Sequence, residues 1–226
     1  MSPSAPMDTE KRKRFGLLGG TFNPPHMGHF ILAQDALEAF ALDEVWFLPC
    51  AQPAHKPERM VVAAEHRVRM LEEGLGNDPR MRISMIEIER SGVSYTVDTM
   101  RQLTKEHPAV DWHFLIGADT LVELPSWRQI DDVLRMCRIL SMRRPGMPSA
   151  QEIRDHIQLP SPWPDRLTAD MFDGHLIDIS STEIRKRVAL RQSIRYLVPV
   201  GVEHYIAAQG LYQGLNRGEE SSNPSS

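Results

Sequence analysis

Residues 17–29 read Leu-Leu-Gly-Gly-Thr-Phe-Asn-Pro-Pro-His-Met-Gly-His. The glycines Gly19 and Gly20 permit a tight turn after the apolar residues and leave backbone N–H groups accessible to an anion. The two prolines end the strand, and residues 26–42 contain good helix formers with no further proline. The stretch therefore predicts a strand, a phosphate-binding turn and the start of a helix.

His26 and His29 are three residues apart and share one face of the first helical turn. This turn also carries N–H donors and the positive end of the helix dipole, which favour a bound phosphate. A lone histidine or a lone Gly-Gly pair is more simply an ordinary structural feature, but here the elements coincide in one short stretch. A zinc pair is the alternative. Neither Cys50 nor Cys137 nor an acidic cluster is near in sequence, so we expect no metal ligands here.

The composition is that of one soluble globular domain. The chain has 226 residues, which is long enough to bury a full core. It is 41% hydrophobic and 25% charged, as is typical of soluble globular proteins. The net charge of −4 argues against a nucleic-acid partner, although a local cleft can still bind a phosphorylated substrate. Without an apolar run of membrane-spanning length, a signal-peptide core or a disulfide pattern, we expect a cytoplasmic protein with no membrane partner.

The two ends of the chain differ in composition from the middle. Because the first residues are rich in Ser, Pro and Ala and the last in Asn, Glu and Ser, we expect a disordered leader at 1–13 and a disordered tail at 214–226. Residues 14–213 are expected to form a single domain.

Apolar strands alternate with helical segments along this domain. We expect strands at 15–18, 44–48, 81–88, 112–116, 138–142 and 176–179, and helices at 29–41, 63–74, 96–106, 130–137, 180–190 and 200–209. Residues 148–164 show no clear period and are expected to form a loop with a short helix. The alternation predicts an α/β fold, a Rossmann-like doubly wound parallel sheet with helices on both faces. Ligands of such sheets bind beyond the carboxyl ends of the strands.

A second candidate phosphate site has the sequence Ser-Ser-Thr-Glu-Ile-Arg-Lys-Arg at 180–187. Ser180 and Glu183 have the spacing of a capping box. The same turn offers N–H groups, hydroxyls and Arg185, a bidentate phosphate ligand. Alone it would be an ordinary capped helix with a basic face. Together with the first helix it supplies two helix N-termini, as a polyphosphate requires.

Further candidates follow other strands. Lys56 could meet a phosphate or be simply solvated. The hydroxyls and N–H groups of 94–96 could accept a carboxylate or only cap a helix. Asp119 follows Gly117 at the end of a buried strand, where a carboxylate suits ribose hydroxyls. Trp127 could stack on a planar heterocycle or belong to the core.

With these segments assembled, the sequence resembles the His-x-Gly-His nucleotidyltransferases and, within them, the bacterial nicotinate-nucleotide adenylyltransferases. The resemblance rests on residues 19–29, 48–49 with 55–56, 94–99, 114–119, Trp127, 144–146, 179–185 and 196–199. Two departures are visible. Asn23 stands where the family often has Asp, and Ala54 stands where a second proline is common.

The resemblance implies transfer of the adenylyl group of ATP to nicotinate mononucleotide with Mg²⁺, giving deamido-NAD and pyrophosphate in NAD biosynthesis. The acceptor phosphate is already ionised at neutral pH, so positioning and charge stabilisation replace a general base. We expect Mg²⁺ to be held by phosphate oxygens and water.

On this basis each candidate residue receives an expected role. The catalytic residues are His26, His29 and Arg185. They also bind ATP, together with Gly19, Gly20, Thr21, Phe22, Gly117, Asp119, Ser180 and Ser181. The mononucleotide-binding residues are Asn23, Lys56, Tyr95, Thr96 and Trp127. Among these, Lys56 is expected to meet the mononucleotide phosphate, Trp127 to stack on the pyridine, and the Tyr95–Thr96 region to receive the carboxylate.

Two other functions stay open. One is transfer to another phosphorylated acceptor, such as phosphopantetheine or the amide mononucleotide; Trp127 and the Ser-Tyr-Thr segment argue against phosphopantetheine. The other is a non-catalytic nucleotide-binding regulator, against which both histidines and Arg185 argue. The sequence also leaves a homo-oligomer open.

Overall fold

The computed structural model describes residues 12–52, 61–143, 146–175 and 177–213. The expected tail, nearly all of the expected leader and the candidate Lys56 therefore lie outside the described residues. Within the described residues, no helix combines the length and the apolar character needed to cross a membrane.

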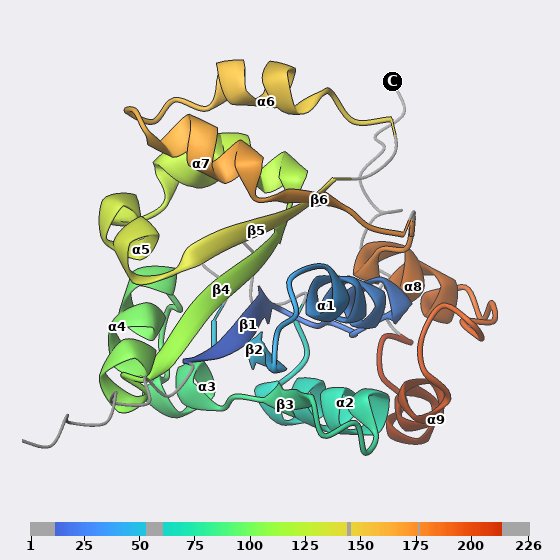
Figure 1. Ribbon diagram of the computed structural model, residues 1–226. Helices are drawn as coiled ribbons and strands as arrows, with labels where there is room; N and C mark the ends of the chain where they lie inside the picture. The colour runs from blue at the N-terminus through green and yellow to red at the C-terminus, as the bar shows by residue number, and fades with distance from the viewer. Residues whose placement is uncertain (1–11, 53–60, 144–145, 176, 214–226) are drawn as a thin grey trace, which may run out of the picture.

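Six strands form one sheet in the order β3-β2-β1-β4-β5-β6 (Figure 1). The strands are β1 (Lys13–Gly20), β2 (Glu44–Pro49), β3 (Met81–Ile83), β4 (Val110–Gly117), β5 (Arg138–Arg143) and β6 (Met171–Asp173). Every neighbouring pair is parallel. The order reverses between β1 and β4, as in a doubly wound sheet, so the predicted fold class is confirmed.

The helices connect these strands and extend beyond them. They are α1 (Met27–Ala39), α2 (Ala64–Leu75), α3 (Ile86–Arg90), α4 (Thr96–Glu106), α5 (Ile130–Met136), α6 (Ala150–His156), α7 (Trp163–Ala169), α8 (Ser181–Ala189) and α9 (Val200–Gln209), with the 3-10 helix η2 (Ala118–Ser126). The predicted bounds of α4 and α9 are confirmed to the residue.

Leu17 and Leu18 show how the sheet is covered on both faces. Successive side chains of a strand point to opposite faces. Leu17 packs in one core cluster with Val97 and Met100 of α4, and Leu18 packs in a second cluster with Ala36 of α1. Both leucines are at most 4% exposed, and burying such a side chain contributes about 1.5–3 kcal/mol. Cover on both faces explains why β1 and β4 read as continuous apolar runs.

A third apolar cluster holds α8 and α9 against α2. It contains Met70, Ile184, Ile194, Val198, Val202, Ile206, Leu211 and Tyr212. Figure 1 shows α8 and α9 on the same side of the molecule as the start of α1. The backbone N–H of Met27 donates to the carbonyl of Leu197 at 3.0 Å, which ties the start of α1 to the segment before α9.

The prediction of one strand over 81–88 was wrong in its second half. Strand β3 ends at Ile83, and residues 86–90 form α3. The change of direction is fixed at Ser84, whose backbone N–H donates to the carbonyl of Phe47 at 2.9 Å. The buried Glu87 then accepts a hydrogen bond from the Thr99 hydroxyl at 2.7 Å, so a polar residue in the apolar pattern faces α4.

The region before α8 also differs from the prediction. Residues 148–164 were expected to be a loop with a short helix; α6 is that short helix, and a second helix, α7, begins in the same range. Ser149 and Glu152 form a capping box that specifies the start of α6. The last strand is β6 at 171–173, paired with β5, whereas residues 177–179 of the expected strand are irregular and Leu176 lies outside the described residues.

His113 on β4 is a buried titratable group within this fold. Its side chain is 4% exposed, and Nδ1 lies 3.0 Å from the carbonyl oxygen of Asp111. Burial lowers the pKa of His113 below 6.5, and the positive charges of Arg14 and Arg138 lower it further. The folded protein therefore holds His113 neutral at a pH where the unfolded chain already binds a proton.

We expect the substitution His113→Asn to make the stability less sensitive to acid. Since the pKa of His113 is lower in the folded state, its contribution to the free energy of unfolding is complete above the unfolded pKa of about 6.5 and is lost as the pH falls through the folded pKa. Urea unfolding at a series of pH values should show a larger acid loss for the wild type than for the variant. Equal losses would contradict this role.

Candidate active site

The carboxyl ends of the strands meet at one edge of the sheet, where the order reverses. Gly20 at the end of β1 is in register with Pro49 of β2, and Gly117 at the end of β4 is in register with Met142 of β5. Strand β4 is also the other neighbour of β1. The segments that follow β1, β2 and β4 therefore leave the sheet side by side, as predicted for a ligand site at this edge.

Close packing beneath the turn explains its two glycines. A Cβ on Gly19 would lie 3.1 Å from Cζ of Phe114, and a Cβ on Gly20 would lie 3.1 Å from Cζ of Phe22. Phe22 itself is 1% exposed, and its ring meets the ring of His29 edge-on at 5.0 Å. The side chain of Phe22 thus supports the turn from below, so contact with a ligand would involve its backbone.

The two histidines lie against each other at the start of α1. The ring centroids of His26 and His29 are 3.8 Å apart, and the backbone N–H of His26 donates to Nδ1 of His29 at 3.1 Å. Because Nδ1 of His29 accepts this bond, the neutral ring carries its proton on Nε2 and can act as a donor there. A Cβ on Gly28 would lie 3.1 Å from the ring of His26, so this glycine makes room for the histidine.

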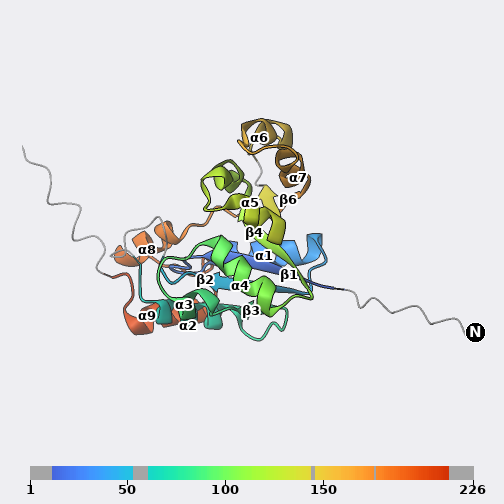
Figure 2. The same ribbon diagram turned by 90° about the vertical axis from the view of Figure 1, so that its left-hand side faces the viewer.

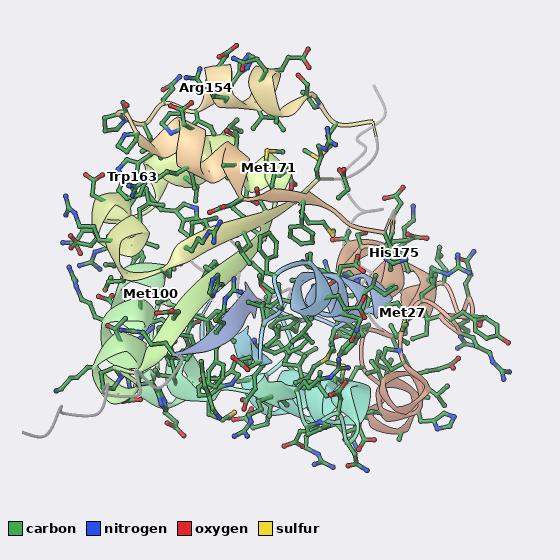
Figure 3. The ribbon with its side chains drawn as sticks, in the orientation of Figure 1. Met27, Met100, Arg154, Trp163, Met171 and His175 are labelled. Carbon is green, nitrogen blue, oxygen red and sulfur yellow. The ribbon has the colours of Figure 1, made fainter. Side chains whose placement is uncertain are left out.

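Helix α8 is fastened directly to the turn that precedes α1. The Ser181 hydroxyl donates to the carbonyl of Pro24 at 2.9 Å, and Nη1 of Arg185 donates to the carbonyl of Asn23 at 2.8 Å. Ser180 caps the helix by accepting from the N–H of Glu183 at 3.1 Å. The two candidate phosphate segments, far apart in sequence, are therefore in contact, and Figure 3 shows Met27 beside α8.

Arg185 is half-buried in this contact. Burial lowers the pKa of its guanidinium, which nevertheless stays charged because an arginine starts far above neutral pH. Its Nη2 donates to the Thr182 hydroxyl at 3.2 Å. The charge is thus held in a fixed orientation at the start of α8, where an anion would feel both the guanidinium and the helix dipole.

Arg67 of α2 is a residue that the sequence analysis missed. Its side chain is 1% exposed and donates to three backbone carbonyls: Thr21 at 3.0 Å, Ala51 at 3.2 Å and Val62 at 3.2 Å. No carboxylate pairs with Arg67 in the described part of the chain. The guanidinium therefore joins the turn after β1 to both flanks of the segment that contains Lys56. The only signal in the sequence was that Arg67 lies three and four residues before Met70 and Leu71, on the apolar face of α2.

The Asn23 side chain is also hydrogen-bonded to other residues of the protein. It is 4% exposed, and its Oδ1 accepts from the Tyr212 hydroxyl at 2.9 Å and from the N–H of Val62 at 3.3 Å. Burial raises the pKa of Tyr212, so its hydroxyl keeps its proton and remains a donor. An amide at this position accepts both bonds without a buried carboxylate, and its side-chain oxygen is used within the protein.

The residues expected at the mononucleotide lie around Phe114 and the start of α4. Half-buried Trp127 meets the ring of Phe114 edge-on at 5.8 Å. Tyr95 is the N-cap of α4, Thr96 is its first residue, and the guanidinium of Arg128 lies 4.8 Å from the centroid of the Tyr95 ring. Arg128 follows Trp127 directly, so it brings the tryptophan segment to the N-terminus of α4. The sequence analysis did not single out Arg128.

The expected adenosine residues begin η2. Gly117 is the N-cap of this helix, and Asp119 lies exposed in its first turn. No ion pair involves the Asp119 carboxylate in the described ranges, so its oxygens face solvent at the carboxyl edge of the sheet.

Comparisons with known proteins identify relatives of this chain. The model of the family described as cytidylyltransferase-like matches residues 17–187. A Halalkalibacterium halodurans protein named "Probable nicotinate-nucleotide adenylyltransferase" is 42% identical over 202 residues, covering 89% of this chain and 92% of the relative. A Lactiplantibacillus plantarum protein of the same name is 41% identical and covers 89% of each chain.

A structural relative is the Plasmodium falciparum nicotinic acid mononucleotide adenylyltransferase complexed with NaAD. It matches with a TM-score of 0.69 and 18% identity, covering 88% of this chain and 97% of that protein. At this identity the likeness shows the fold.

We expect Arg67→Met to lower the free energy of unfolding by about 3 kcal/mol or more, because three buried carbonyls lose their donor. The matched control is Arg69→Met, two residues away on the same helix, where the side chain is 56% exposed and pairs with Glu72 and Glu73. That change should cost less than about 1 kcal/mol. Urea unfolding of both variants measures the difference, and similar losses would contradict the role of Arg67.

Proposed function

The chain belongs to the cytidylyltransferase-like family and, within it, to the nicotinate-nucleotide adenylyltransferases, and we propose that it transfers the adenylyl group of ATP to nicotinate mononucleotide. The products are nicotinate adenine dinucleotide, which is deamido-NAD, and pyrophosphate. The observation that carries this proposal is the contact between the starts of α1 and α8. It joins the segment that leads to His26 and His29 to the helix that carries Arg185, which supports a site for transfer between two polyanions.

In the proposed reaction, a phosphate oxygen of the mononucleotide attacks the α-phosphorus of ATP. The bond from this phosphorus to the oxygen that bridges it to the β-phosphate breaks, and its electron pair leaves with pyrophosphate. The attacking phosphate is already ionised, so the site needs donors and positive charge more than a base. His29 donates from Nε2 and His26 lies beside it on the ATP phosphates, while Arg185 and Ser181 take the pyrophosphate side. The backbone of 19–22 borders the same phosphates.

Mg²⁺ fits this donor set as a partner of the triphosphate. The residues assigned to the phosphates are histidine, arginine and serine, whereas Mg²⁺ prefers oxygen ligands and keeps several waters. The described residues include no group of three or more His, Cys, Asp or Glu side chains arranged to hold a metal ion. The ion, when bound, neutralises charge on the phosphates and is held by their oxygens and water.

The acceptor side of the proposal rests on Trp127 and the N-terminus of α4. Trp127 stacks on the pyridine ring, while the first N–H groups of α4 near Tyr95 and Thr96 receive its carboxylate. The Arg128 guanidinium beside Tyr95 also lies 3.9 Å from the Asp98 carboxylate in the first turn of α4, so in this proposal the N–H groups of the helix start receive the carboxylate. Lys56 stays the candidate for the mononucleotide phosphate, and Gly117 with Asp119 for adenosine. We place this reaction in the cytoplasm, with which two free, buried cysteines agree.

We expect the purified protein to release pyrophosphate from ATP and Mg²⁺ when nicotinate mononucleotide is added. A panel of acceptors measured by a coupled pyrophosphate assay should rank nicotinate mononucleotide first, the amide mononucleotide lower and phosphopantetheine inactive. ATP binding without turnover on any acceptor would instead support a nucleotide-binding regulator.

We expect His29→Ala to lower kcat roughly 100- to 1,000-fold, because a donor to the developing charge is removed. The KM for nicotinate mononucleotide should change much less. Steady-state kinetics with both substrates varied separates the two effects, and an equal loss in kcat and in mononucleotide binding would remove the transition-state role.

We expect Trp127→Ala to have the opposite kinetic effect, on KM more than on kcat. Removal of the stacking ring should raise the KM for the mononucleotide roughly tenfold, with a smaller effect on kcat. The same kinetic measurements test it, and an unchanged KM would place Trp127 in the core alone.

A further inference from the structure

Residues 127–129 are the whole connection between η2 and α5. The helix η2 ends at Ser126, and α5 begins at Ile130. This connection carries Trp127, whose backbone N–H donates to the carbonyl of Leu124 at 2.9 Å. The place of the Trp127 ring therefore depends on what holds this short segment to its neighbours.

Gln129 is the residue at which the connection turns into α5. Its backbone is in the left-handed region, with φ 52° and ψ 47°, which a residue with a Cβ adopts only where its surroundings hold it. Its carbonyl accepts the first bonds of α5, from the N–H groups of Asp132 at 3.0 Å and Val133 at 3.3 Å. Its side-chain Oε1 accepts from Nη1 of Arg101 on α4 at 3.1 Å.

The same guanidinium reaches a second acceptor on α5. Nη2 of Arg101 donates to Oδ2 of Asp132 at 2.6 Å. Because the guanidinium is planar and its donors have fixed directions, two acceptors on one guanidinium define an orientation as well as a distance. Figure 2, like Figure 1, shows α5 beside α4. Arg101 thus fixes how the start of α5 is oriented on α4.

Asp98 in the first turn of α4 holds the connection at a second point. Its carboxylate lies 3.9 Å from the guanidinium of Arg128 and 3.7 Å from that of Arg101. Arg128 in turn lies over the ring of Tyr95, the N-cap of α4. The two residues that follow Trp127 are therefore both joined to α4, Arg128 through Asp98 and Gln129 through Arg101.

These polar contacts lie at the surface, while an apolar cluster holds the two helices together beneath them. Val97 and Met100 of α4 share this cluster with Ile130 and Val133 of α5. Exposed ion pairs contribute little to the free energy of unfolding, so the packing of α4 on α5 does not depend on Arg101. The contacts of Arg101 act instead on the orientation of the connection.

We propose that Arg101 is a positioning residue for the acceptor side of the site. It holds the connection that carries Trp127 against the first turn of α4, so that the stacking ring and the helix N-terminus receive one mononucleotide together. This inference rests on the adenylyl transfer proposed above and adds a residue to which no substrate contact is assigned.

The substitution Arg101→Met tests the proposal because it removes both donors and keeps an unbranched side chain that suits a helix. The KM for nicotinate mononucleotide should rise about fivefold, the upper range for loss of an exposed charged pair. The kcat and the KM for ATP should change less than about twofold. The matched control is Arg135→Met, which removes an ion pair to the same Asp132, at 3.4 Å, from within α5. It should leave all three constants unchanged.

A measurement without turnover reads the position of Trp127 directly. The protein has four tryptophans, and single Trp→Phe variants assign their indole N–H resonances in 15N-labelled protein. In the substrate-free protein, Arg101→Met should shift or broaden the Trp127 resonance, and Arg135→Met should not. The Trp46 resonance, on β2, should stay in place in both variants, and both should unfold at the same urea concentration as the wild type.

Two results would overturn the proposal. One is a Trp127 resonance that is the same in Arg101→Met as in the wild type. The other is an equal rise in the KM values for ATP and for the mononucleotide, which would indicate a general disturbance of the site. If the wild type transfers nothing to the mononucleotide, the proposed function fails, and the Trp127 resonance of the substrate-free protein still decides whether Arg101 positions this residue.

Discussion

A buried guanidinium holds the segments at the carboxyl edge of the sheet in place. Arg67 donates to the carbonyls of Thr21, Ala51 and Val62, so one side chain joins the segments after β1 and β2 to the start of α2. A charge at 1% exposure is costly unless it is fully hydrogen-bonded, and here the carbonyl dipoles supply that compensation. The contacts of Asn23 with α8 and Tyr212 build on the same turn. The turn that leads to the histidines is thus held by contacts from distant parts of the chain.

The sequence predicted most of the fold because its apolar periods are strong where both faces of an element are buried. Strand β4 and helix α4 were located closely from these periods. The errors fall where an element is too short, or contains a polar residue, so that its apolar pattern is weak. Residues 86–90 continue an apolar spacing that suits a strand or a short helix, and a buried Glu87 resolves it only through its contact with α4. Strand β6 has three residues, too few for a period to be read.

The sequence predicted the motifs of the candidate site but not the residues that hold those motifs in place. Residues 19–29 and 180–185 carry local signals of anion binding, and the structure brings them into contact through Ser181 and Arg185. Arg67 acts through three hydrogen bonds to backbone carbonyls and Tyr212 through one hydrogen bond to Asn23, and neither arrangement leaves a period or spacing in the sequence. The missing side chain of Gly28 accommodates the ring of His26, a contact that the spacing of the motif does not reveal.

The sheet ends on both sides in a strand of three residues, β3 on one side and β6 on the other. Edge strands expose unpaired N–H and C=O groups that can recruit a strand of another molecule, and shortness limits this recruitment. Arg82 with Glu44 and Arg143 with Asp173 add ion pairs at these margins. The sheet therefore cannot readily grow from one molecule into the next. Self-association of this protein would have to use its helical surfaces, and the same feature protects it against aggregation through strand pairing at high concentration.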